Sequence, residues 1–415
     1  MSNQTAESAA SLFDRAATAA RFDNAHLVRT VVALLCDHDP LAVRGEAERR
    51  ALMLIGAAWN AGWQPAELAR QVRRTADPAT ANLALVAIAA DHAPRAASSL
   101  DRGWSAQLTS LALPVVGSST CWLVEWARTE AMPWAEQVRA AVALLGSLAT
   151  ISPIAKLIPP PGTRTGDNAL IDLTTKVDDP MLDRVRALLA QAESTTFEAE
   201  AETFTAKAQQ LMTRHAIDMA MVSAGSRRAE RPDTIRIAID EPYLAAKSLL
   251  LQLVAASSRC RAVFHQRFAM SSVVGFAADL TATETLFTSL LVQAQVAMLV
   301  AAKSAPPGTR ARSRGFRSAF LTAYAHRVGE RLDEVNAHVV ADAEAETGHS
   351  ILPVLAARSA AVDSAIDEMF GRLRTTAARR SVDAAGWASG RSAADRARLN
   401  SGDLDPATCA LSEPR

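Results

Sequence analysis

Apolar residues recur at helical spacing throughout the first part of the chain. The stretch "LAVRGEAERRALMLIGAAWNAG" shows the repeat of about 3.6 residues that is typical of an amphipathic helix. Asp39 and Asp77 are good helix N-caps, and Pro40 and Pro78 follow them at the position where a helix tolerates proline. The pattern therefore predicts a helical N-terminal domain over residues 1–152.

A proline-rich stretch interrupts this pattern. The sequence "SPIAKLIPPPGTRTGDN" contains three consecutive prolines and two glycines, which do not continue a helix and favour an extended connector. We therefore predict a linker over residues 153–179.

The most regular pattern lies in residues 180–224, which predict a helical hairpin. Thr195 and Glu198 have the spacing of a capping box between two helices. The second helix is expected to extend to about His215, and Asp218 is placed to cap a third short turn. Two short helices bury only one seam, so this hairpin must dock on another part of the protein. The side chains expected to be mostly buried are Leu188, Leu189, Phe204, Leu211 and Met212.

Residues 232–400 predict a small α+β domain with about three strands. The stretch "TIRIAID" alternates apolar and polar residues as a half-buried strand does, and "RAVFHQ" with "MSSVVGF" has the pattern of a β-hairpin. A long helix follows, for which Thr281 and Glu284 have the spacing of a capping box. Residues 401–415 are expected to form a flexible tail, so the predicted fold class is mostly α with a C-terminal α+β domain.

The hairpin resembles the bacterial and phage family catalogued as domain of unknown function 2786. One departure is Ala216, where the family usually has glycine, because a left-handed helix end is less comfortable with alanine. The signature residues are Leu188, Leu189, Ala190, Ala192, Glu193, Ser194, Thr195, Thr196, Glu198, Glu200, Ala201, Lys207, Ala208, Leu211, Met212, His215, Ile217 and Asp218.

The resemblance extends beyond the hairpin. The pieces "VVGFAADLTATETLFTSLLVQ", "FRSAFLTAYAHRVGERL" and "GWASGRSAADRARL" are similar to the usual C-terminal companion of that family. The first 150 residues, and "GWQPAELAR" above all, look like the helical extension of actinobacterial members. The resemblance implies an intracellular protein with an α+β tail, and it brings no known activity or catalytic residue.

Composition indicates a soluble, cytoplasmic protein. Hydrophobic residues make up 49% of the chain and charged residues 21%, while Lys+Arg and Asp+Glu both number 44, so an attraction to polyanions must be local. The four cysteines fit no zinc or redox spacing, and the N-terminus has no apolar signal segment. The most apolar run, residues 286–302, is interrupted by polar side chains, so we expect it not to span a membrane.

One helical face combines histidines and acids. His326, Glu330, Glu334 and His338 recur every four residues, and three successive members share a face that could hold a divalent metal. Ion pairs with nearby arginines are the ordinary alternative use of such a face. The two-histidine metalloprotease spacing is absent, and no cofactor is expected.

Cys260 is the one cysteine with cationic neighbours. Arg259 and Arg261 flank it, and cations lower the pKa of a thiol and make it a nucleophile. His265 would face the opposite side of a strand, because side chains alternate, which argues against a catalytic dyad. A structural thiol is the favoured interpretation.

Local positive charge is the strongest remaining signal. Residues 303–320 carry five cations and no acid, and residues 372–398 carry seven arginines against two aspartates. Should these segments converge, they would form a patch able to hold phosphates, and the alternative is an ordinary solvated surface. The candidate nucleic-acid-binding residues are Arg310, Arg312, Arg314, Arg317, Arg379, Arg380 and Arg391.

These observations favour a binding or interaction protein whose partner is a polyanion, nucleic acid above all, with a protein partner also open. The alternative is an enzyme, such as a hydrolase, with its site in the C-terminal domain around His326, Glu330 and the β-hairpin. The chain has no Gly-x-Gly-x-x-Gly, P-loop or Gly-x-Ser-x-Gly motif, so no catalytic residue is assigned and the oligomeric state stays open.

Overall fold

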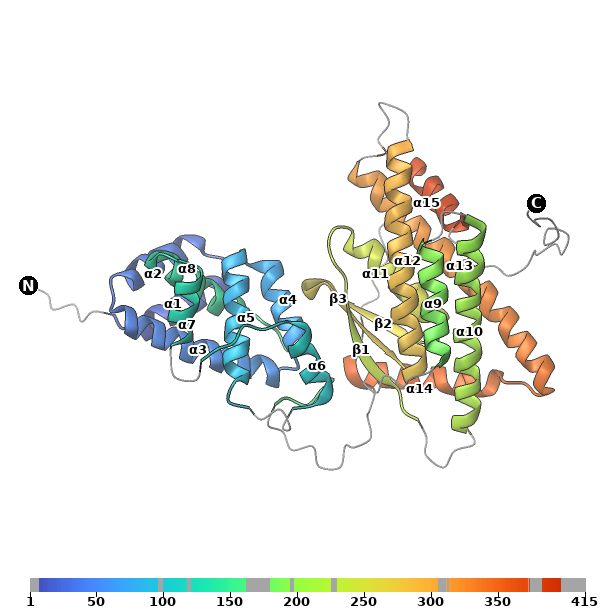
Figure 1. The fold of residues 1–415 in the computed structure, drawn as a ribbon, viewed down its shortest axis with the longest axis horizontal. Helices are drawn as coiled ribbons and strands as arrows, with labels where there is room; N and C mark the ends of the chain where they lie inside the picture. The colour runs from blue at the N-terminus through green and yellow to red at the C-terminus, as the bar shows by residue number, and fades with distance from the viewer. Residues whose placement is uncertain are drawn as a thin grey trace, which may run out of the picture. The chain divides into compact units, whose positions relative to one another are not determined.

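The computed structural model divides the chain into two compact units, Met1–Thr174 and Thr175–Arg415, which are described separately (Figure 1). Helices predominate, and a small antiparallel sheet lies in the second unit, which confirms the predicted fold class. The structure describes residues 7–95, 100–117, 121–161, 180–194, 198–224, 230–304, 311, 313–371, 373 and 383–396.

Unit 1 is helical throughout its described residues. Asp39 and Asp77 act as N-caps, as predicted: Asp39 Oδ2 accepts a hydrogen bond from Ala42 N at 2.9 Å, and Asp77 Oδ1 accepts one from Ala79 N at 3.1 Å. The helices are α1 (Ala9–Arg21), α2 (Ala25–Cys36), α3 (Pro40–Asn60), α4 (Pro65–Thr75), α5 (Pro78–His92), α6 (Arg102–Ser110), α7 (Trp122–Thr129) and α8 (Trp134–Ala149).

The proline-rich segment begins on the surface of unit 1. Residues 151–161 contain no helix or strand, and Ile154 N donates a hydrogen bond to Ala61 O at 2.9 Å. Gly62 permits this approach, because its φ is +95° and a Cβ there would collide with the backbone of Ile154. Residues 162–179 lie outside the described part, so the limits of the linker stay a prediction.

Unit 2 combines helices with a three-stranded sheet. The strand order is β1-β3-β2, and both pairings are antiparallel, so the predicted strand and β-hairpin are confirmed. The elements are α9 (Pro180–Ser194), α10 (Glu198–Ala224), β1 (Asp233–Ala238), α11 (Leu244–Ser257), β2 (Arg261–His265), β3 (Met270–Gly275), α12 (Ala277–Ser304), α13 (Arg314–Thr347), α14 (Leu352–Phe370) and α15 (Ala384–Arg396).

Helices cover both faces of the sheet. Val273 of β3 joins the main core, to which α11 and α12 contribute, whereas the adjacent Val274 packs with Val362 and Ile366 of α14. Neighbouring residues of a strand point to opposite faces, so β3 is buried along its whole length. The sheet therefore lies between α14 on one side and the helical core on the other.

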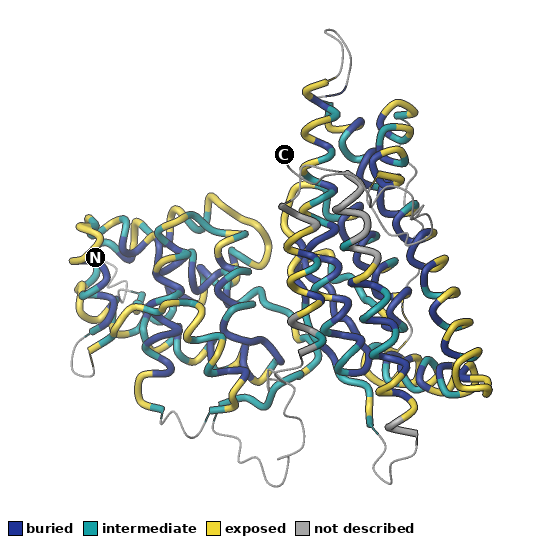
Figure 2. The backbone as a smooth tube through the Cα atoms, turned by 45° about the vertical axis from the view of Figure 1, so that its right-hand side comes forward, coloured by how far each residue is buried: buried dark blue, intermediate teal, exposed yellow. Residues whose placement is uncertain are grey.

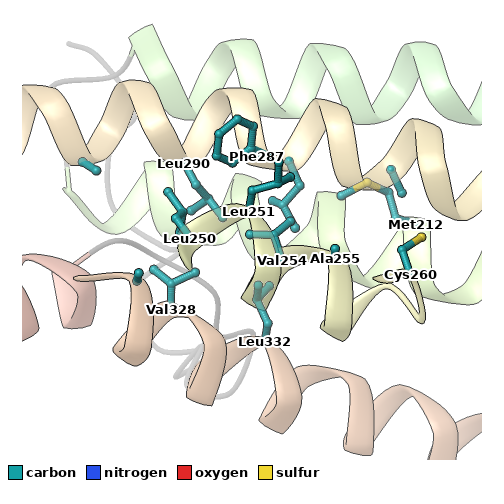
Figure 3. Close-up of a cluster of buried hydrophobic side chains, with 14 of the residues drawn as sticks. Met212, Leu250, Leu251, Val254, Ala255, Cys260, Phe287, Leu290, Val328 and Leu332 are labelled. Carbon is teal, nitrogen blue, oxygen red and sulfur yellow. The ribbon is translucent and has the colours of Figure 1, made fainter. Parts of the chain in front are cut away.

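The main core lies where α11 passes between α12 and α13 (Figure 3). Buried surfaces of the helices face this region, and exposed surfaces face outward (Figure 2). Burial of large apolar side chains is the dominant stabilising contribution to such a core. The central side chains are Leu250, Leu251, Val254, Phe287, Leu290, Val328 and Leu332.

The predicted hairpin is present as α9 and α10, but α10 is longer than expected. The prediction that the second helix ends near His215, with Asp218 capping a third turn, is wrong, because α10 continues to Ala224. This helix contains no glycine or proline, and Ala216, where the family usually has glycine, is buried inside it. Thr195 lies outside the described residues, so the predicted capping box is not described.

Apolar and polar contacts both dock the hairpin on the rest of unit 2. Leu189 and Met212 are buried in the core, and Leu188, Phe204 and Leu211 are partly buried, which agrees with the expectation that these side chains are mostly buried. The polar contacts centre on one side chain of α13.

Asn336 is that side chain, and it links three helices. Its Oδ1 accepts hydrogen bonds from Thr213 Oγ1 at 2.8 Å and Gln209 Nε2 at 3.2 Å, both from α10. Its Nδ2 donates to Ser257 O of α11 at 2.6 Å. Hydrogen bonds from one side chain to two neighbouring helices favour one docking geometry, so α10 has a defined register against α13.

Helix α12 begins earlier than the sequence pattern indicated. Thr281 Oγ1 donates to Ala277 O at 3.1 Å inside the helix, so the predicted capping box of Thr281 and Glu284 is wrong. Among the described residues, α12 is also the one helix whose length and composition would allow it to cross a membrane, although its apolar run, residues 286–302, is interrupted by polar side chains. Of its most apolar window 39% is buried inside the fold, and the core helix of a soluble protein passes the same test.

Candidate functional site

Helices α13 and α15 pack side by side, with their backbones in close approach. A Cβ at Gly386 would lie 2.5 Å from Phe316 O, and one at Gly390 would lie 2.9 Å from Phe320 Cα, so only glycine fits at these positions. Residue numbers increase in the same direction along both helices, so the two run parallel. The N-terminal ends of α13 and α15 therefore lie together.

Two of the predicted arginines belong to this end. Arg314 is exposed in the first turn of α13, and Arg317 is half-buried with its Nε lacking a hydrogen-bond partner. Neither has an acidic partner among the residues that the structure describes. Ser313 caps the helix by accepting a hydrogen bond from Phe316 N at 3.1 Å. Four further candidates lie outside the described residues: Arg310, Arg312, Arg379 and Arg380.

Arg391 differs from Arg314 and Arg317, because its guanidinium is already paired with a carboxylate. Its Nη1 and Nη2 each lie 3.1 Å from the carboxylate of Glu330 on α13. Arg327 Nη1 also donates to Glu330 at 3.0 Å, and its guanidinium contacts Asp395. These bonds hold the pKa of Glu330 below its ordinary value, so this carboxylate is ionised and already engaged.

The predicted metal face is the same face of α13. Glu334 lies 3.8 Å from Arg327, the His326 ring lies 5.9 Å from the ring of Trp387, and His338 is exposed. Within the described ranges, no three His, Cys, Asp or Glu side chains are grouped so that they could hold a metal ion. The side chains on this face mainly attach α15 to α13.

Cys260 is enclosed in the core. Burial, with a smaller contribution from the nearby Asp279, raises the pKa of its thiol to about 12, although Arg259 and Arg261 act in the opposite direction. A thiol that is protonated at neutral pH is a poor nucleophile. Its sulfur fills the space above Gly275, where a Cβ would collide with it, so the cysteine packs β3 against α12.

A buried ion cluster surrounds the first turn of α12. Asp279, which is 2% exposed, lies 3.3 Å from Arg259 and 3.5 Å from Arg358 of α14. Arg358 also pairs with Glu230 at 3.0 Å, and its guanidinium lies 3.5 Å from the centre of the Phe276 ring. Burial raises the pKa of Asp279, while the two arginines lower it. This cluster attaches α14 to the sheet side of the core.

The β-hairpin carries a hydrogen-bonded histidine–serine pair that the sequence pattern did not indicate. His265 Nε2 and Ser272 Oγ are 2.8 Å apart, which is the distance expected between a serine nucleophile and its base. Burial lowers the pKa of His265, so the imidazole is neutral at pH 7 and able to accept a proton. Ser272 itself is 1% exposed. The pairing depends on strand register, which the spacing of seven residues alone does not fix.

Unit 1 contains a buried polar network around His92 that the sequence pattern did not predict. Trp104 Nε1 donates to His92 Nε2 at 2.6 Å, and the other ring nitrogen of His92 lies 2.9 Å from Ile88 O. Trp59 Nε1 donates to Asp91 Oδ2 at 2.9 Å. Burial lowers the pKa of His92, and both ring nitrogens are engaged. Such complete satisfaction is typical of a structural histidine rather than a catalytic one.

Three of the signature residues, Glu198, His215 and Asp218, lie on α10. His215 is half-buried, and the exposed Asp218 lies 3.4 Å from Arg214, which also pairs with Glu346 of α13 at 2.6 Å. Glu198 is the first residue of α10. These three residues therefore belong to the helix that docks the hairpin on α13.

A comparison with protein families finds a match within the hairpin. The model of a family described as protein of unknown function (DUF2786) matches residues 181–219, which comprise most of α9 and α10. The match supports the resemblance of the hairpin to that family. Comparison with curated proteins finds no match, and comparison with solved structures finds none either.

Proposed function

We propose that this chain is a cytoplasmic binding protein for polyanions, and for nucleic acid above all. The proposed contact surface is the end of unit 2 at which α13 and α15 begin. The proposal includes the idea that residues 232–400 are the usual companion of the hairpin family and that the first 150 residues are an actinobacterial-type extension.

One observation supports the proposal most directly. The close contact of Gly386 with Phe316 joins the starts of two helices whose preceding segments are rich in arginine. Arg314 and Arg317 add two cations without acidic partners among the described residues, and the N-terminal ends of helices favour anions. Guanidinium groups bind phosphate oxygens in pairs, so this surface suits a phosphate backbone.

Such a surface would bind phosphate rather than read bases. Sequence-independent binding of this kind arises from released counterions, so the affinity falls steeply as salt increases. Stacking of bases needs exposed aromatic side chains, and the chain contains only two tyrosines. We therefore expect weak binding with little sequence preference.

The test is a fluorescence-polarisation titration of labelled duplex DNA with the full chain at several salt concentrations. The double variant Arg314→Ala/Arg317→Ala should weaken binding similarly for all sequences and flatten the logarithmic salt dependence by at most about two phosphate equivalents. Arg391→Ala is the matched control, because Glu330 already neutralises Arg391. The absence of binding at low salt would refute the proposal, as would equal effects of the double variant and the control.

A hydrolase is the second candidate, and the His265–Ser272 pair is the observation that favours it. Serine acting as a nucleophile requires a neutral base within hydrogen-bond distance, and this pair supplies one. A fluorophosphonate probe labels activated serines covalently. Labelling at Ser272 that is lost in His265→Gln would favour the enzyme, and an unlabelled protein would remove this candidate.

A further inference from the structure

Helix α12 carries one continuous exposed ridge. Residues four apart along a helix lie in a slanted row on its surface, and such rows are the contact elements of packed helices. The exposed residues of this row are Glu284, Thr288, Val292, Val296 and Val300, with Leu299 and Lys303 beside its C-terminal end.

The middle of the ridge is apolar to an unusual degree. Val292 is 45% exposed, Val296 and Val300 are each 56% exposed, and Leu299 is 51% exposed. Residues 285–302 include no charged residue. Single exposed apolar side chains are normal on a protein surface, but a contiguous group of them marks an interaction site.

The two ends of the ridge carry opposite charges. Glu284 lies at one end and Lys303 at the other, and neither has a partner among the described residues. They are 19 positions apart, which corresponds to about 28 Å along the helix axis. The ridge therefore has an acidic end, an apolar centre and a basic end.

We infer that this ridge binds a second copy of the chain, with the two α12 helices antiparallel about a twofold axis. A pairing centred between residues 293 and 294 sets Glu284 opposite the partner's Lys303 and brings Val292 within one position of the partner's Val296. The twofold axis repeats each contact, so the dimer gains two ion pairs at its edges and an apolar centre. This self-association goes beyond the proposed function and does not depend on it.

The charges at the two ends of the ridge favour an antiparallel second copy over other binding partners. Parallel pairing would set Glu284 against the partner's Glu284 and Lys303 against the partner's Lys303, so like charges would repel. An anionic lipid surface would attract Lys303 but repel Glu284 and would leave the order of charges unexplained. An antiparallel second copy satisfies both ends at once.

The first test is sedimentation equilibrium of the full chain over a range of concentrations. We expect a monomer–dimer equilibrium for the wild type and a monomer for Val296→Asp at the same concentrations. Leu352→Asp is the matched control, because Leu352 is also 56% exposed but lies on α14, and it should dimerise normally. Circular dichroism and the melting temperature establish that each variant is folded.

The second test uses the charges. Glu284→Lys or Lys303→Glu alone replaces two attractive pairs by repulsive ones and should weaken dimerisation on the order of tenfold at low salt. The double variant Glu284→Lys/Lys303→Glu should dimerise as the wild type does. A mixture of the two single variants should form heterodimers, because each supplies the charges that the other lacks.

A wild type that is monomeric at every concentration would overturn the inference, as would dimers of Val296→Asp. Failure of the double variant to restore a dimer that each single change weakens would also overturn it. Cosedimentation of a monomeric wild type with phosphatidylserine vesicles, lost in Val296→Asp, would assign the ridge to a membrane surface instead.

Discussion

Replacing Gly386 by alanine tests the tightest helix packing in unit 2. The added Cβ would lie 2.5 Å from Phe316 O and 3.0 Å from Phe316 Cα, whereas ordinary contacts begin at 3.4 Å. Because backbone atoms cannot rotate aside, α15 would have to move away from α13 by about 0.9 Å.

Two opposing contributions determine how Gly386→Ala changes the stability of unit 2. Overpacking a tight contact costs about 1–3 kcal/mol, whereas alanine in a helix interior is more favourable than glycine by about 1 kcal/mol. We therefore expect Gly386→Ala to destabilise unit 2 by up to about 2 kcal/mol, and Gly390→Ala to act in the same direction. Gly315→Ala is the matched control, because the nearest atom to its Cβ would be Ser313 Oγ at 3.9 Å, and this change should be neutral or stabilising.

The assay is urea unfolding followed at Trp387, the one tryptophan among residues 175–415. Labelling with fluorotryptophan gives this residue its own ¹⁹F NMR signal, which separates α15 from unit 1. A free energy of unfolding for Gly386→Ala equal to or above that of the wild type would refute the close packing of α15 on α13.

Two further predictions concern buried charges. His92 has a pKa that burial depresses below the value of about 6.5 in an unfolded chain, so the unfolded state binds the proton more tightly. The stability of unit 1 should be intact above about pH 6.5 and should fall as the pH drops from there towards the folded pKa, because protonated His92 no longer accepts the hydrogen bond of Trp104. Thermal melts of wild type and His92→Gln between pH 7.5 and 5 measure this, and equal pH dependence would contradict it. Asp279→Asn should cost about 3–5 kcal/mol, because it removes the buried carboxylate that faces both Arg259 and Arg358 and leaves Arg358 with Glu230 as its one acidic partner among the described residues. In a double-mutant cycle Asp279→Asn with Arg358→Met should cost clearly less than the two single changes together, and additive costs would show that the pair is not coupled.

Much of the fold could be predicted because local pattern and tertiary packing agree. Asp39 and Asp77 are recognisable as caps, and the alternation in "TIRIAID" marks a strand whose inner face is needed by the core. The end of α10 was not predictable in this way. The helix continues past Asp218 because tertiary contacts bury Ile217 and Ala220 and thereby extend it.

The candidate site was less predictable, because its contacts join residues far apart in the sequence. Gly386 and Gly390 indicate a close helix contact, but they do not indicate which helix is contacted or in which direction it runs. The engagement of Arg391 by Glu330 follows only from that docking. The His265–Ser272 pair likewise depends on the register of β2 and β3, which the short 3-10 helix Gln266–Phe268 between them sets.

The parallel packing of α15 on α13 also constrains how the protein is made. Synthesis proceeds from the N-terminus, so α13 leaves the ribosome before α15 exists. At about 5–20 residues per second, the roughly fifty residues between Thr347 and Arg396 take about 3–10 s to add. During that interval the side of α13 around Phe316 and Phe320 lacks the helix that later covers it. Nascent chains of this protein therefore expose an aggregation-prone helix surface for seconds, and a chaperone that binds apolar helices would act on them at this stage.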